Sequence, residues 1–204
     1  MEYTVRFFYF HYKIAVALKP KKKIILGIDP GTVLFGYGVI EIVGNKLSLI
    51  SLGTIELNKL PNQPAKLEKI FERVCWLIEQ YQPDDCAIEA PFYGKNPQSM
   101  LKLGRAQGVA MAAVLTNKIE ITEYAPKKIK QSITGNGNAS KEQVAAMLQR
   151  ILSFNDLPKY LDATDALGVA VCHYFQTSSP LLANSKAKNW KHFLKKNPEK
   201  IAGG

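Results

Sequence analysis

The order of strand-like and helix-like segments is the feature that most constrains how this chain of 204 residues can fold. Apolar or β-rich runs predict five strands, at residues 23–29, 36–43, 46–57, 85–90 and 119–125. Amphipathic or helix-favouring segments predict helices at residues 64–81, 99–116, 127–133, from 140 onward, and 162–175. We therefore expect an α/β fold with one mixed five-stranded sheet, antiparallel at first and parallel afterwards, flanked by helices.

Two local signals refine this layout. Gly44 and Asn45 separate two β-rich runs, and a two-residue loop with glycine first predicts a hairpin with a type II′ turn. Ser140 precedes a helical pattern and Gln143 follows three residues later, which is the pattern of a capping box.

Four acidic residues lie at the ends of strands and at the start of a helix, where this layout can bring them together. Asp29 follows the first strand, Glu89 ends the fourth, and Asp162 and Asp165 face the same way at the start of the last helix. If the first and fourth strands are neighbours, four carboxylates gather and raise one another's pKa unless a cation intervenes. Mg²⁺ or Mn²⁺ would suit such a cluster, and two ions can clamp a phosphate for in-line displacement. Each acid alone also fits a turn, a solvated strand end or a helix cap.

Cysteine and histidine patterns exclude other kinds of site. The three cysteines have no C-x-x-C spacing, and the three histidines form no H-x-x-x-H pair. A disulfide framework and a zinc site are therefore not expected, and any metal would be held by oxygen ligands.

Several segments together resemble RuvC-type Holliday junction resolvases. The resemblance covers about residues 23–177 and depends on residues 24–32, 36–40, 87–89, 102–110 and 162–167, in the family's order. It implies a ribonuclease H-like fold and a cytoplasmic homodimer that acts in DNA recombination and repair. It also implies symmetric, Mg²⁺-dependent nicking of four-way DNA junctions to give 5′-phosphate and 3′-hydroxyl ends, and cooperation with a branch-migration motor.

The resemblance also assigns roles to single residues. Asp29, Glu89, Asp162 and Asp165 occupy the positions of the family's catalytic tetrad. The resemblance implies that this tetrad holds two Mg²⁺ ions, which Mn²⁺ can replace.

Three further residues match the family's DNA-contacting positions. Lys130 and Lys141 match basic positions near the scissile phosphate, although solvated lysines at helix starts are the alternative. Phe92 matches an aromatic residue that stacks on unpaired bases, and packing on its own domain is the alternative. The small-residue helix from Ser99 is a candidate dimer contact, with simple core packing as the alternative.

Other functions fit parts of the pattern. Another ribonuclease H-like nuclease, acting on RNA or RNA–DNA hybrids, would use the same carboxylates. A non-catalytic binder of branched DNA is a second alternative, although unneutralised acids repel DNA phosphates. Residues 28–32 also resemble the first phosphate motif of actin-like ATPases, but the second domain and second glycine-rich loop of those proteins do not fit in this length.

The charge of the chain is concentrated at its ends. The formal net charge is +10, and residues 1–23 and 183–204 each have six basic residues and one acidic residue, whereas residues 24–182 have fifteen of each sign. We expect an N-terminal extension at 1–22 outside the fold, a nuclease domain at 23–177 and a basic tail at 178–204. The apolar run at 7–18 is too short to span a bilayer, so no membrane segment is expected.

The tails are predicted to add nonspecific affinity for DNA. Deleting both should flatten the salt dependence of junction binding, because fewer counterions are released from the DNA, and should leave junction cleavage intact. Binding titrations over a range of salt concentrations, with cleavage assays beside them, measure both effects. An unchanged salt dependence would contradict the prediction.

Overall fold

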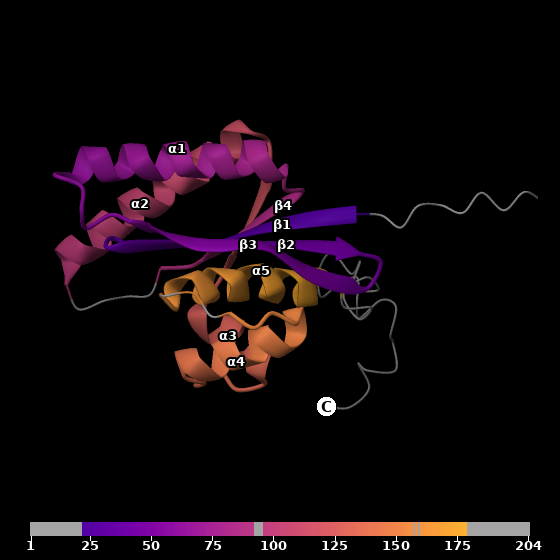
Figure 1. Cartoon of the computed structure of the whole chain (residues 1–204). Coiled ribbons are helices and arrows are strands. Elements are labelled where there is room, and N and C mark those ends of the chain that lie inside the picture. Colours follow the sequence, from indigo (N-terminus) through magenta and orange to yellow (C-terminus); the bar gives the residue numbers. More distant parts are fainter. Residues whose placement is uncertain (1–21, 92–95, 157, 159, 179–204) are drawn as a thin grey trace, which may run out of the picture.

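A computed structural model describes residues 22–91, 96–156, 158 and 160–178 (Figure 1). Its strands are β1 (Lys22–Asp29), β2 (Leu34–Val43), β3 (Lys46–Glu56), β4 (Asp85–Glu89) and β5 (Glu120–Tyr124). Its helices are α1 (Gln63–Tyr81), α2 (Pro97–Thr116), α3 (Pro126–Thr134), α4 (Lys141–Leu152) and α5 (Asp162–Ser178). Among these described residues, no helix has the length and apolar character needed to cross a membrane.

The five strands form one mixed sheet in the order β3-β2-β1-β4-β5. The β1–β2 and β2–β3 pairs are antiparallel, whereas the β1–β4 and β4–β5 pairs are parallel. This confirms the predicted sheet, including the neighbouring first and fourth strands. Ile28 pairs with Ile88, so the residues that follow them, Asp29 and Glu89, lie side by side at the carboxyl ends of β1 and β4.

Helices cover both faces of the sheet. Figure 1 shows α1 and α2 on one face, and α5 on the other with α3 and α4 outside it. Residues of β1 alternate between two cores: Leu26 and Ile28 pack with α1 and α2, and Ile25 packs with α3, α4 and α5. The same alternation turns Asp29 towards the α5 face.

Glycines in β1 and β2 let α5 lie directly on the sheet. A Cβ atom at Gly27 would stand 2.2 Å from the carbonyl oxygen of Ala166, and one at Gly38 would stand 2.6 Å from the Cα atom of Leu167. A Cβ atom at Gly36, the strand partner of Asp29, would stand 2.3 Å from the carbonyl oxygen of Asp162. No other residue type fits these contacts without moving the helix, so the glycines determine where α5 begins.

Both local predictions agree with the structure. The Ser140 side chain accepts from the Gln143 amide, and the Gln143 side chain accepts from the Ser140 amide, so the capping box is confirmed. A type II′ turn requires a positive φ at its first central residue and not at its second. Gly44 has a φ of 63° and Asn45 has no positive φ, so the turn fits this type.

Element ends differ from the predictions by a few residues. Helix α2 begins at Pro97 rather than residue 99, because the Asn96 side chain accepts from the amides of Gln98 and Ser99 and proline suits the first helical position. Strand β1 begins at Lys22 and α5 ends at Ser178, each one residue inside a predicted tail. Beyond these two residues, the tails lie outside the described part of the chain.

A methyl group added to one of the glycines that α5 covers should destabilise the fold. We expect Gly38→Ala to lower the free energy of unfolding by about 1–3 kcal/mol, because the added atom displaces the α5 backbone. Gly104→Ala is the matched control: its added Cβ meets no atom within 4 Å, and alanine favours the helix by up to about 1 kcal/mol. Urea unfolding compares the two, and equal midpoints would contradict the prediction.

Candidate active site

Acidic residues from two elements, β1 and α5, meet at the carboxyl edge of the parallel strands. Asp29 ends β1, while Asp162 and Asp165 belong to the first turn of α5. One carboxylate oxygen from each of these three residues lies within 4.8 Å of the others, and all three side chains are partly buried. The structure thus brings together three of the four acids that the sequence singled out.

The fourth acid, Glu89, lies on the wall of the same cavity. It lines a hollow of about 330 Å³ with Asp29 and Asp165, although it does not belong to the group of three within 4.8 Å. The remaining lining residues are Pro126, Ile129, Lys130, Lys141 and Val144. Acidic and basic side chains therefore share one cavity with apolar walls.

Burial and mutual repulsion make two of the acids weak. Burial raises the pKa of Asp29 to about 8, and the charges of Glu89 and Asp165 contribute to the rise. Burial, together with the charge of Asp165, raises the pKa of Glu89 to about 7. Without a cation, protonation of these two carboxyl groups is therefore favoured at higher pH than usual, because burial disfavours the charged form and neighbouring negative charges add to that cost.

Lys141 offsets part of the negative charge. Its Nζ atom lies 2.5 Å from Asp165 and 3.7 Å from Asp162. Burial lowers the pKa of Lys141, but the hydrogen bond and charge of Asp165 outweigh that effect and raise the pKa overall. Because Lys141 is the first residue of α4, the Ser140 capping box determines its position.

Lys130 reaches the cavity from α3. Its Nζ atom donates to the carbonyl oxygen of Ala139 at 2.8 Å, which fixes the long side chain along the cavity wall. Both lysines that the sequence singled out therefore lie beside the acids.

The acidic group has the chemistry of a site for hard cations. Its ligand atoms are carboxylate oxygens, with no imidazole or thiolate in the group, which favours Mg²⁺ or Mn²⁺ over zinc or copper. The raised pKa values of Asp29 and Glu89 point the same way, because a divalent cation would compensate for the burial of their charge and for the repulsion from neighbouring acids that raise these pKa values.

Sequence reasoning missed one residue near the acids and named one that the structure does not describe. Gln107 of α2 lines a smaller cavity that also includes Asp29 and Glu89. Gln107 lies within residues 102–110, a segment that carries the family resemblance, but it was not assigned a role there because a polar residue among small residues of a helix has no single interpretation. Phe92 lies outside the described residues, so its stacking role stays a prediction.

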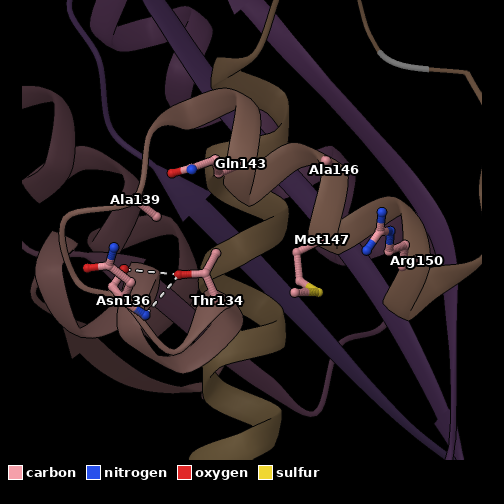
Figure 2. A pocket seen from close by; sticks show the side chains of 7 residues that line it. All are labelled: Thr134, Asn136, Ala139, Gln143, Ala146, Met147 and Arg150. Carbon is pink, nitrogen blue, oxygen red and sulfur yellow. Dashed lines mark hydrogen bonds between the residues drawn. The ribbon is translucent and has the colours of Figure 1, made fainter.

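A larger hollow lies along the outer side of α4 (Figure 2). Its lining residues are Thr134, Asn136, Ala139, Gln143, Ala146, Met147 and Arg150, none of which is acidic. The Thr134 hydroxyl donates to the Asn136 carbonyl oxygen and accepts from the Asn136 amide, which closes one end of the hollow. Its lining therefore lacks the carboxylate ligands that a hard cation prefers.

Known proteins of similar sequence share one name. The sequence model of the family "Crossover junction endodeoxyribonuclease RuvC" matches residues 25–173. A protein of that name from Porphyromonas gingivalis is 58% identical over 189 residues, covering 90% of this chain and 100% of the relative. Another from Cytophaga hutchinsonii is 62% identical over 179 residues, covering 88% of each chain.

Solved structures agree with the sequence comparison. Thermus thermophilus RuvC is similar with a TM-score of 0.69 and 28% identity, over 76% of this chain and 95% of that chain. The same protein in complex with a Holliday junction substrate gives a TM-score of 0.71 and 28% identity, over 76% and 94%. The predicted ribonuclease H-like fold is thereby confirmed.

The raised pKa values predict how the stability of the metal-free protein depends on pH. Between about pH 4 and pH 8 the folded chain binds more protons at Asp29 and Glu89 than the unfolded chain does, so the free energy of unfolding should fall as pH rises through this range. Asp29→Asn should weaken this dependence, whereas Asp156→Asn, at an exposed acid, should leave it unchanged.

Urea unfolding in EDTA at pH 5.5 and pH 8.5 measures the effect. Adding Mg²⁺ at pH 8.5 should restore stability to the wild-type protein and restore less to Asp29→Asn. Identical pH dependence in wild type and Asp29→Asn would contradict the assignment of the buried charge to this cluster.

Proposed function

This chain belongs to the crossover junction endodeoxyribonuclease RuvC family, and from that premise we propose that it resolves four-way (Holliday) DNA junctions by symmetric nicking of two strands. Family membership makes it an endodeoxyribonuclease, a hydrolase of phosphodiester bonds. The observation that carries the proposal is the group of three carboxylates, from Asp29, Asp162 and Asp165, that lie within 4.8 Å of one another. Two of these acids, Asp29 and Asp165, line a cavity together with Lys130 and Lys141. The similar T. thermophilus protein solved with a Holliday junction substrate supports the choice of DNA.

The acids are proposed to hold the metal that a nuclease of this family requires. Asp29, Asp162 and Asp165 have the spacing to share one ion, and Glu89 on the same wall would serve a second. Mg²⁺ is the proposed ion, with Mn²⁺ able to replace it. Bound divalent ions lower the pKa of a ligated water and stabilise charge on a departing oxygen.

The lysines are proposed to act on the phosphate. Lys141 is already paired with Asp162 and Asp165, so a phosphate that enters the cavity finds a cation held in place rather than a mobile side chain. Lys130 lines the same cavity as a second positive charge, fixed by its bond to the carbonyl oxygen of Ala139. The apolar walls formed by Ile129 and Val144 strengthen these interactions by excluding water.

An excess of basic residues in one segment of the chain would attract a DNA strand to a site that also contains acids. Residues 95–141 contain eight basic residues and two acidic ones, although residues 24–182 as a whole are neutral. Helix α3 also contributes Lys127 and Lys128, both exposed. We assign to this segment the attraction of the DNA backbone, which outweighs the repulsion from the acids.

A homodimer is proposed because a nearly two-fold junction calls for two matched active sites. Helix α2 is the candidate contact. Leu101 and Leu115 are 63% and 57% exposed there, and Gly104 and Gly108 have open space beside them on the same helical face. Cooperation with a branch-migration motor and stacking by Phe92 are proposed from the family resemblance alone.

Removing one carboxylate should separate cleavage from binding. We expect Asp29→Asn and Glu89→Gln each to slow cleavage of a synthetic four-way junction by about 100-fold or more, because the metal loses a ligand, while junction binding remains. Asp156→Asn should cleave like the wild type. The measurement is the cleavage rate with and without Mg²⁺, with binding followed in Ca²⁺.

The same assay tests the alternative functions. A four-way junction, a matched duplex and an RNA–DNA hybrid are offered in parallel. Cleavage of the hybrid but not of the junction would identify a different ribonuclease H-like nuclease, and binding of the junction without cleavage would identify a structural binder. Either carboxylate variant cutting at the wild-type rate would overturn the active-site assignment.

A further inference from the structure

A second cavity adjoins the acidic one at the same two carboxylates. Asp29 and Glu89 line both cavities, so the two hollows meet at these residues. The second cavity, of about 160 Å³, extends towards α2, which supplies Leu103 and Gln107. Its other walls include Pro30 and Pro91, which follow the ends of β1 and β4.

The two cavities differ in chemistry. The acidic cavity contains Lys130 and Lys141, which suit a phosphate. Among the described residues that line the second cavity there is no lysine or arginine. Apart from the shared carboxylates, the only polar side chain in this described lining is Gln107, and the other residues are proline, alanine and leucine. Apolar walls with one well-placed amide are suited to a flat, uncharged group that has hydrogen-bonding edges, such as a nucleobase.

Gln107 is held in a fixed orientation. Its side chain is buried, with 6% of its surface exposed, and its Nε2 atom donates to Oε1 of Glu123 at 2.6 Å. An ionised carboxylate only accepts hydrogen bonds, so the amide nitrogen must face Glu123. Within the part of the chain that the structure describes, Gln107 makes no other side-chain hydrogen bond, so its carbonyl oxygen and second N–H are left as an acceptor and a donor. A glutamine amide presents this pair to base edges in many protein–DNA complexes.

A cleaved DNA strand has to continue on both sides of the scissile bond. If the phosphate binds at the acids and one neighbouring part of the backbone lies along the lysines, the nucleotide on the other side meets the second cavity. We propose that this cavity is the subsite for the base beside the scissile phosphate, and that Gln107 is a specificity-determining residue that selects the sequence at which the junction is cut. The proposal rests on the proposed function, because it requires a junction cut at the acidic cluster.

Junctions that differ only in the two nucleotides flanking the scissile bond test the proposal. Single-turnover cleavage rates in Mg²⁺ are measured for every combination, with wild type, Gln107→Met and the control Gln80→Met, which alters an exposed glutamine on α1. We expect Gln107→Met to shrink the ratio of best to worst rates by about 10-fold, since one base-edge contact discriminates by that order. Gln80→Met should keep the wild-type ratio, and junction affinity in Ca²⁺ should stay within about twofold for both.

Glu123 offers a second route to the same test. Glu123→Ala removes the anchor at an exposed position and should weaken the preference, whereas Glu123→Gln keeps a hydrogen-bond acceptor and should retain most of it. These variants also cover the case in which Gln107→Met does not fold.

The outcomes separate the two proposals. A wild-type protein that cuts no junction overturns the proposed function itself. A wild-type protein that cuts junctions without sequence preference, or a folded Gln107→Met or Glu123→Ala that keeps the full wild-type preference, overturns the role of Gln107 alone.

Discussion

The contact between α5 and the sheet is the constraint on which the rest of the site depends. Gly27, Gly36 and Gly38 have no side chains, and the α5 backbone occupies the space where Cβ atoms would stand. Helix and sheet therefore approach more closely than ordinary side chains allow, and the first turn of α5 comes to lie over the end of β1. The packing of the α5 backbone on the sheet thus determines how far Asp162 and Asp165 lie from Asp29.

That close approach concentrates negative charge, and the structure only partly compensates for it. Lys141 pairs with the two helical acids, but Asp29 and Glu89 remain buried with raised pKa values. Such a cluster favours the binding of a divalent cation at neutral pH, because the positive charge offsets the repulsion between carboxylates that packing brings together.

Sequence patterns predicted the sheet and the acids better than the details around them. Alternating and apolar runs depend on local geometry, so the strands and the neighbouring β1 and β4 could be predicted, and with them the meeting of Asp29 and Glu89. The start of α2 was missed because a side-chain cap from Asn96 decides it. Gln107 was missed because its role depends on a contact with Glu123 on another element, sixteen residues away, which no local pattern records.

The order of the elements along the chain also decides when the acids meet. All five strands end by Tyr124, whereas Asp162 and Asp165 belong to the last described helix. A ribosome that has made the first 150 residues has therefore made the whole sheet without the acidic cluster. A chain interrupted there, or one whose last helix has detached, holds Asp29 and Glu89 at the sheet edge without Asp162 and Asp165 beside them. The acidic group therefore forms only after α5 has been made and has packed on the sheet.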